Sequence, residues 1–259
     1  MYCIEDFVYR KMWDRYDLEW HNIHQDVNIL VGINGKGKTT LLDAIDGYYN
    51  NKFPVSFFKK YGEDRIEATH LDCPVYYIQS SDIPAQVKKK GNSLLYERLL
   101  QVVVQNEHRD SFFNYRMRQL NYPEESNRIG QRIELLFKEI NSYFNESDKY
   151  ITIDPVKNML VFKEGVDERT VTLAMLSAGE KQLLLILLTV FLMDEKPAVL
   201  LMDEPEVSLH IEWQERLIKS LRKLNKNCQL IVTTHSPSIF ASGWENYITY
   251  IEDLYTNVK

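Results

Sequence analysis

The chain has 259 residues, a formal net charge of −6 and 44% hydrophobic residues, enough apolar surface for a sizeable core. An acidic balance argues against a surface that binds nucleic acid over its whole extent. The N-terminus lacks the form of a secretion signal, no apolar stretch approaches the roughly 20 residues of a membrane-spanning helix, and three scattered cysteines indicate neither disulfides nor zinc. We therefore expect a cytoplasmic protein with no membrane partner, built as a single two-lobed domain over residues 1–259.

The first predicted elements lead to a glycine-rich loop. The aromatic segment 7–20 predicts antiparallel edge strands, and 27–31 predicts a buried strand. The run GINGKGKTT then precedes an amphipathic helix. Glycines let backbone N–H groups face phosphates, Lys38 can reach the β/γ oxygens, and Thr39 can hold Mg²⁺. The sequence thus predicts a nucleoside triphosphate site at Asn34, Gly35, Lys36, Gly37, Lys38, Thr39 and Thr40.

The middle of the chain predicts an inserted helical lobe over residues 84–147. Apolar residues recur there at three- and four-residue spacing, with a break at 121–123. From Gln86 to Lys138 the ten basic residues outnumber the six acidic ones, which leaves the remainder of the chain at −10. A basic stripe could face a nucleic-acid backbone, so nucleic acid is a possible partner. The alternative is an ordinary solvated helix face with mixed charges.

Strand-like segments 150–153 and 159–162 predict a hairpin that leads into the run LSAGEKQ, residues 176–182. Ser177 and Glu180 have the spacing of a helix capping box, and Gly179 permits the close approach of another group. A helix N-terminus presented in this way can receive a phosphate.

A second acidic motif follows the strand-like segment 198–202, which reads as buried on both faces. Asp203 would hold the Mg²⁺ shell, while Glu204 would polarise the attacking water. A helix at about 211–224 and a strand at 229–234 continue the alternation of helix and strand. This alternation predicts a largely parallel sheet that is covered on both faces.

Together, GINGKGKTT, LSAGEKQ, DEPE and the later IVTTH resemble the ABC-type ATPase family in order and spacing over nearly the whole chain. The resemblance implies an α/β fold with a mixed, largely parallel core sheet, antiparallel edge strands and an inserted helical lobe. It implies ATP and Mg²⁺ as cofactors. It also implies a homodimer, or a higher oligomer of dimers, in which Ser177 and Gly179 contact the γ-phosphate held by the other subunit.

The resemblance assigns further roles to residues at strand ends. His235 would sense the γ-phosphate, and Gln79 would meet both Mg²⁺ and the attacking water. Trp13, Tyr16 or Trp20 could stack on adenine, as an upstream aromatic does in some ABC proteins; core packing or an exposed strand face is the alternative.

The branch of the family follows from length and from motif details. The 139 positions between Lys38 and Ser177 hold two modest helices and leave no room for the coiled-coil arm of SMC-like proteins. A transporter's nucleotide-binding subunit would fit the size. However, Ala178-Gly179-Glu180-Lys181 and DEPEVSLH depart from the usual transporter motifs and look like the RecF/OLD-like branch, which acts in DNA repair or prokaryotic antiviral defence.

OLD proteins carry a nuclease domain after the ATPase, whereas 24 residues follow His235 here. We therefore expect the ATPase subunit of an antiphage defence complex, one that gates a separately encoded effector such as a nuclease or toxin. A RecF-like DNA repair or recombination ATPase and a membrane transporter subunit are the alternatives.

Overall fold

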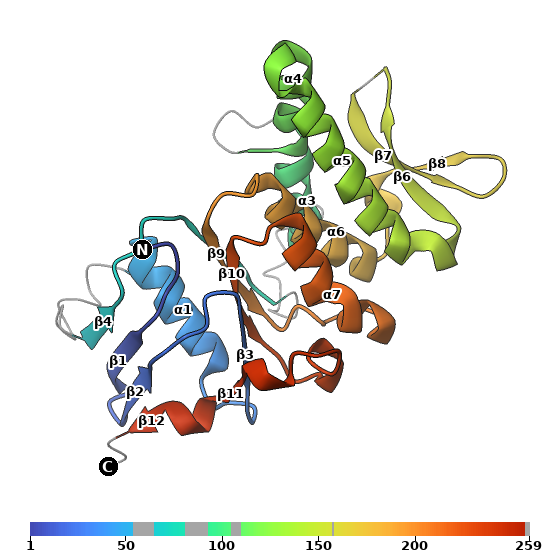
Figure 1. Cartoon of the computed structure of the whole chain (residues 1–259). Helices are drawn as coiled ribbons and strands as arrows, with labels where there is room; N and C mark the ends of the chain where they lie inside the picture. The colour runs from blue at the N-terminus through green and yellow to red at the C-terminus, as the bar shows by residue number, and fades with distance from the viewer. Residues whose placement is uncertain (54–64, 81–92, 105–109, 157, 257–259) are drawn as a thin grey trace. The chain divides into compact units, whose positions relative to one another are not determined.

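The computed structural model describes residues 1–53, 65–80, 93–104, 110–156 and 158–256 (Figure 1). The chain divides into two compact units. The first unit contains residues 1–80, 195–206 and 226–259, and the second contains 81–194 and 207–225. The predicted lobe boundaries at 84 and 147 fall within the second unit. This unit also includes the run LSAGEKQ, residues 176–182, which we call the signature segment. The lobe as defined by these boundaries stays a prediction.

The first unit is built on a five-stranded sheet in the order β11-β3-β10-β9-β5. Its described pairings are all parallel, which confirms the predicted parallel core. The strands are β3 (Val27–Val31), β5 (Val75–Ile78), β9 (Ala198–Asp203), β10 (Cys228–Thr233) and β11 (Ile248–Tyr250). Helix α1 (Lys38–Tyr49) packs on β9 and β5 and buries Leu41, Leu42 and Ile45. Burying such side chains stabilises the unit by about 1.5–3 kcal/mol each.

A second sheet in the same unit has the order β12-β2-β1-β4 and is antiparallel, as predicted for the edge strands. Its strands are β1 (Phe7–Met12), β2 (Tyr16–Trp20), β4 (Ile66–Ala68) and β12 (Tyr255–Thr256). The described part of this unit also contains the short helices η4 (Pro237–Ile239), η5 (Glu245–Tyr247) and η6 (Ile251–Leu254). The pairing of β12 with β2 brings the C-terminal segment beside the N-terminal strands.

The second unit contains five described α-helices: α3 (Leu94–Val103), α4 (Phe112–Asn121), α5 (Pro123–Phe144), α6 (Ala178–Leu192) and α7 (Ile211–Leu224). The predicted break between α4 and α5 is confirmed. Pro123 at the first helical position and Glu124 and Glu125 in the first turn favour a helix start there. The expectation of two modest helices before Ser177 is wrong, because residues 93–144 alone hold three, and α5 has 22 residues.

A three-stranded antiparallel sheet completes the second unit, with β6 (Lys149–Asp154), β7 (Met159–Glu164) and β8 (Arg169–Val171). The predicted hairpin is confirmed, and β8 is an additional strand. Two short helices, η2 (Asn145–Ser147) and η3 (Leu173–Met175), flank the sheet in sequence, and η3 leads directly into the signature segment. Within the described ranges, no helix combines the length and the apolar character needed to cross a membrane.

Candidate nucleotide and metal site

The phosphate loop lies between β3 and α1, as predicted. Gly35 and Gly37 have φ angles of 78° and 95°, a backbone conformation that favours glycine. A Cβ atom added to Gly37 would come within 2.6–2.9 Å of Met12, Trp13 and Tyr255 side-chain atoms. The backbone conformation therefore explains glycine at position 35, and the conformation together with the close packing explains glycine at position 37.

Lys38 is almost completely buried, with 5% of its surface exposed. Its ammonium group donates to the Gly32 carbonyl at 2.9 Å and to the Ile33 carbonyl at 3.4 Å. Burial lowers the pKa of Lys38, while the nearby carboxylates of Glu204 and Glu252 act in the opposite direction. The loop thus holds the ammonium group of Lys38 at the end of β3, where it could bind the negatively charged phosphates.

Thr39 and Asp203 meet at the predicted metal position. The Thr39 hydroxyl donates to the Asp203 carboxylate, with distances of 3.0 and 3.2 Å to its two oxygens. The Thr233 hydroxyl donates to the same carboxylate at 2.6 Å, and Asp203 is only 4% exposed. A hydroxyl and a carboxylate suit Mg²⁺, which takes oxygen ligands and usually keeps several waters. The residues present therefore fit a bound magnesium ion held by Thr39 and Asp203.

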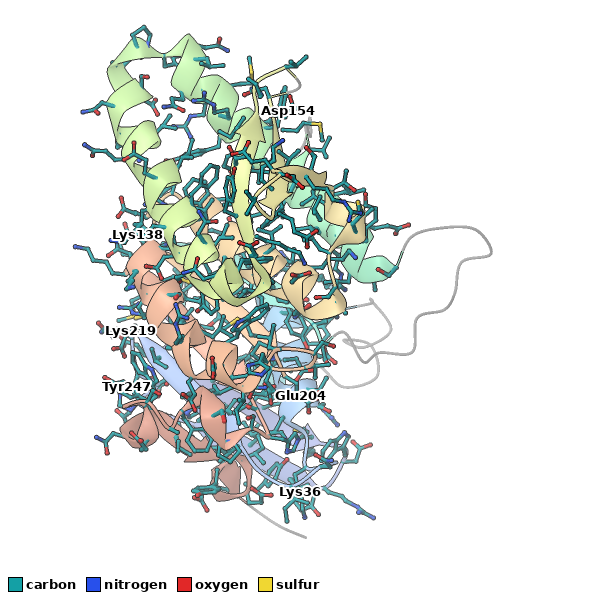
Figure 2. All side chains as sticks on the ribbon, turned by 90° about the vertical axis from the view of Figure 1, so that its right-hand side faces the viewer. Lys36, Lys138, Asp154, Glu204, Lys219 and Tyr247 are labelled. Atoms are coloured by element: carbon teal, nitrogen blue, oxygen red, sulfur yellow. The ribbon has the colours of Figure 1, made fainter. Side chains whose placement is uncertain are left out.

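Glu204, labelled in Figure 2, directly follows Asp203. Its backbone is in a left-handed conformation, with φ of 46°. Its N–H donates to the carbonyl of Thr233 at 3.1 Å, which fixes the turn. One carboxylate oxygen lies 3.2 Å from Nε2 of His235. Burial raises the pKa of Glu204, as does the repulsion from Asp203 and Glu206, against the attraction of His235 and Lys38. A carboxylate with a raised pKa is a better general base.

Sequence reasoning missed Glu206, although it lies in the DEPE motif. One of its carboxylate oxygens accepts hydrogen bonds from the Thr234 hydroxyl, the His235 N–H and the Ser236 N–H, at 2.5, 2.9 and 3.3 Å. The turn after β9 is thereby joined to the turn after β10.

Gln79 comes directly after β5 and is half-buried. Because Ile78 pairs with Met202 in parallel register, Gln79 leaves the sheet at the level of Asp203. This position agrees with the predicted one at the carboxyl ends of the strands. Contact with a metal ion or a water stays a prediction.

The three aromatic candidates for adenine stacking lie in different surroundings. Trp20 is 3% exposed and belongs to the core, so core packing accounts for it. Tyr16 packs against Tyr255, with the two rings tilted by 37° and their centroids 5.1 Å apart. Trp13 is 46% exposed and lies beside Gly37 of the phosphate loop. Trp13 is therefore the candidate whose position suits a nucleobase best.

Two C-terminal residues hold the phosphate loop from outside, and sequence reasoning missed both. The Ile33 N–H donates to the Glu252 carboxylate at 3.1 Å, and the Tyr255 hydroxyl donates to the Lys36 carbonyl. These contacts depend on the pairing of β11 with β3 and of β12 with β2. No motif near Glu252 or Tyr255 in the sequence signals them.

The signature segment lies in the second unit and forms the predicted capping box. The Glu180 N–H donates to the Ser177 hydroxyl at 3.2 Å, and the Ser177 N–H donates to the Glu180 carboxylate at 2.7 Å. A Cβ atom on Gly179 would clash with the Ser208 carbonyl oxygen, so the close approach that glycine permits is by this chain's own backbone. The contact of Ser177 and Gly179 with a nucleotide stays a prediction.

Lys149 at the start of β6 supports this capping box. Its ammonium donates to the Glu180 carboxylate at 2.9 Å. Burial raises the pKa of Glu180, but the hydrogen bonds from Lys149 and the Ser177 backbone outweigh it and hold that pKa below its usual value.

Arginines of the helical region pair within the second unit. Arg128 donates two hydrogen bonds to Asp194, at 2.9 and 3.0 Å, and Arg118 pairs with Glu125. Arg132 is 6% exposed and lies 3.3 Å from Asp194. These three arginines are therefore neutralised by carboxylates, which favours the alternative of a helix face with mixed charges; nucleic acid as a partner stays a prediction. Lysines such as Lys138 and Lys219 do point outward (Figure 2), whereas 88–90 lie outside the described residues.

The parallel sheet, the phosphate loop, the carboxylates after β9 and the histidine after β10 define the class of protein: a P-loop ATPase of the ABC type. Residues 78–241 match the family AAA_21, described as "AAA domain, putative AbiEii toxin, Type IV TA system". The chain belongs to this family, as the resemblance to defence-system ATPases predicted.

Two curated relatives are similar to part of the chain. The retron Ec83 probable ATPase of Escherichia coli is 31% identical over 135 residues, which cover 41% of this chain and 24% of that protein. The retron Vc95 probable ATPase of Vibrio cholerae serotype O1 biovar El Tor is 27% identical over 172 residues, or 52% of this chain and 32% of that protein. The chain therefore spans a third or less of the length of these relatives.

Solved structures confirm the fold class. The SmcHead bound to the C-winged helix domain of ScpA has a TM-score of 0.53 at 15% identity and covers 93% of this chain and 92% of its own. Stu0660 of Streptococcus thermophilus has a TM-score of 0.54 at 14% identity, covering 98% of this chain and 76% of its own. At these identities the likeness concerns the fold alone.

Proposed function

We propose that the protein is a Mg²⁺-dependent ATPase that dimerises around ATP and thereby gates a separately encoded effector in an antiphage defence complex. The observation that carries this proposal is the arrangement at the carboxyl ends of β3, β9 and β10. There, Thr39 lies 3.0 Å from Asp203, and Glu204 lies 3.2 Å from His235.

Each side chain has a separable role in this proposal. Bound Mg²⁺ and ATP would supply a charge-neutralised triphosphate whose γ-phosphorus can accept a water oxygen. Lys38 would bind the phosphates, and Thr39 and Asp203 would hold the metal. Glu204 would take the proton of the attacking water, because its raised pKa makes it a better base than an ordinary carboxylate. His235 would fix the orientation of Glu204.

Dimerisation would complete the site. The N-terminus of α6 carries a positive partial charge and presents Ser177 as an exposed N-cap, a geometry that can receive a phosphate from another subunit. In this proposal, Ser177 and Gly179 of one subunit close over the nucleotide held by the phosphate loop of the other.

The proposed defence role is supported by the family and by the two relatives. Both carry the name retron probable ATPase, and the family description refers to a toxin and a Type IV toxin–antitoxin system. We propose a cytoplasmic complex in which ATP-driven closure controls a partner such as a nuclease or toxin.

A mixing experiment tests the composite site. Lys38→Ala and Ser177→Arg chains should each be inactive alone, whereas their heterodimer has one doubly disabled site and one intact site. Mixing should therefore restore part of the Mg²⁺-dependent ATP turnover. The matched control is a mixture of Lys38→Ala with Glu204→Gln chains, which places one lesion in each site and should restore nothing.

Three outcomes would each contradict a different part of the proposal. Heterodimers that form by native mass spectrometry without restored turnover would contradict composite sites. Turnover that is unaffected by EDTA would contradict the metal role of Thr39 and Asp203. For the biological role, cells that carry the locus with Lys38→Ala should lose phage protection in a plaque assay, and undiminished protection would contradict ATP-driven gating.

A further inference from the structure

Glu206 joins two turns that each carry a residue of the proposed catalytic machinery. One of its oxygens accepts three hydrogen bonds from residues that follow β10: the Thr234 hydroxyl, the His235 N–H and the Ser236 N–H. The other oxygen, Oε2, is buried and has no hydrogen-bond partner among the described groups. Burying a carboxylate costs free energy unless its hydrogen bonds compensate, so the three bonds to Oε1 must account for its position.

The chain between Glu204 and Glu206 is short and stiff. Glu204 is fixed in a left-handed conformation by its N–H bonds to the carbonyl and hydroxyl of Thr233, and Pro205 has a restricted φ. As a result, the turn from Glu204 to Glu206 contacts His235 twice. The backbone N–H of His235 donates to the Glu206 carboxylate at 2.9 Å, and Nε2 of His235 lies 3.2 Å from the Glu204 carboxylate.

We infer that Glu206 is a positioning residue that sets His235 at hydrogen-bond distance from Glu204. This inference rests on the proposed catalytic roles of Glu204 and His235. Glu206 acts through the histidine and needs no contact with the nucleotide. Loss of its acceptor oxygen releases the backbone of His235 and lets the imidazole move away from the base.

The test is a double-mutant cycle between Glu206→Leu and His235→Ala. Leucine has a similar volume to glutamate but offers no acceptor, whereas Glu206→Gln keeps an amide oxygen that can accept the same N–H bonds. Glu206→Leu should lower kcat by about 10²-fold or less, in the range expected for a misplacement of about 1 Å. Glu206→Gln should retain most of the parent kcat, and the Kd for ATP should stay unchanged in both variants.

Coupling between the effects of the two substitutions on kcat separates a positioning role of Glu206 from a merely structural one. If Glu206 acts through His235, the double variant should be no slower than His235→Ala alone. A purely structural residue would instead lower the unfolding temperature and reduce kcat by the same factor in both backgrounds. The exposed Glu245 provides the control, because Glu245→Leu in the same unit should leave kcat at the parent value.

The outcomes distinguish this inference from the proposed function. Parent-level turnover in His235→Ala would overturn the proposed role of the histidine itself. An impaired His235→Ala combined with a parent-like Glu206→Leu, or with additive effects, would overturn the positioning role. Should Glu206→Leu fail to fold, Thr234→Val replaces it in the cycle, because it removes the 2.5 Å hydrogen bond to the same oxygen, together with the local bonds between the Thr234 hydroxyl and Ser236. It should show the same lack of additivity at a smaller loss of kcat.

Discussion

Two carboxylates, one in each unit, have opposite electrostatic surroundings. In the second unit, Asp194 accepts hydrogen bonds from Arg128 and from the Tyr115 hydroxyl, and Arg132 lies 3.3 Å away. Burial raises the pKa of Asp194, but these partners outweigh it and hold that pKa below its usual value. In the first unit, the repulsion among neighbouring carboxylates adds to burial and raises the pKa of Glu204.

The difference indicates which charges stabilise the fold and which serve chemistry. Ionisation of a carboxylate whose pKa is lowered in the folded state stabilises the fold. Ionisation of a carboxylate whose pKa is raised destabilises the fold. A left-handed backbone does not separate the two residues, because φ is 46° at Glu204 and 53° at Asp194. Carboxylates held close to like charges, with raised pKa values, cluster at functional sites. By this criterion Glu204 belongs to a site, and Asp194 belongs to the framework of its unit.

Glu204→Gln gives the largest expected effect. Its amide keeps the shape of the side chain but cannot take a proton, so turnover should fall by about 10²–10⁴-fold while ATP binding is retained. Because ionised Glu204 is disfavoured in the folded protein, the variant should also unfold at a slightly higher temperature at neutral pH. Steady-state kinetics measure the loss of turnover, and thermal unfolding measures the change in unfolding temperature. Parent-level turnover would show that Glu204 is not the base.

Asp194→Ala should have the opposite profile, with a large loss of stability and little change in turnover per folded molecule. It leaves Arg132 buried without its carboxylate, and breaking a buried pair in this way costs about 3–5 kcal/mol. Denaturant unfolding measures the loss. In the parent, the contribution of Asp194 should be present above the ordinary Asp pKa, about 3.9, and should be lost as the pH falls through the lowered folded-state pKa. An unchanged unfolding midpoint would contradict this assignment.

The same comparison shows how the charges of the helical region are paired. A count of ten basic and six acidic residues from 86 to 138 says nothing about which charges are paired. The main carboxylate partner, Asp194, lies outside that segment, 66 positions from Arg128. Reversing the charges of Arg116, Arg118, Arg128 and Arg132 together should therefore destabilise the second unit, which makes those variants a poor probe of a nucleic-acid partner.

Lys38→Ala should weaken ATP binding by roughly 10–100-fold, because a hydrogen bond to a charged group contributes about 1.5–3 kcal/mol. Lys36→Ala is the comparison variant. Lys36 is also predicted to belong to the site, but its side chain is exposed on the same loop, so we expect a smaller loss than for Lys38→Ala. Calorimetric titration with ATP measures both variants. Equal losses in the two would indicate a general electrostatic effect of the loop instead of a specific role for Lys38.

Local features of the nucleotide site were predictable from sequence, and long-range ones were not. The order of strand, glycine loop and helix around Lys38, and the capping box at Ser177, depend on neighbours within a few residues. Glu252 contacts Ile33 across 219 positions, and Glu206 contacts His235 across 29. Those contacts follow from strand order in the sheets, which no spacing in the sequence specifies.

The smallest expected effect concerns Lys149, where a paired framework charge adjoins a residue of the proposed site. Lys149→Met removes the hydrogen bond to Glu180 at 2.9 Å but leaves the bond between Glu180 and the Ser177 N–H in place. The pKa of Glu180 should then rise toward its usual value, and the capping box that presents Ser177 should loosen. Since a single hydrogen bond to a charged group contributes about 1.5–3 kcal/mol at most and both hydrogen bonds of the capping box survive, we expect ATP-dependent dimerisation to weaken by less than about tenfold. ATP binding to the isolated subunit should not change.

Two control variants accompany Lys149→Met. Lys149→Arg, which keeps the positive charge, should dimerise like the parent, and Lys163→Met, on the neighbouring strand β7, should have no effect. Sedimentation equilibrium with Glu204→Gln as the background measures the dimer without turnover. Identical dimer affinity for Lys149→Met and the parent would show that the charge at Lys149 stabilises its unit without reaching the signature segment.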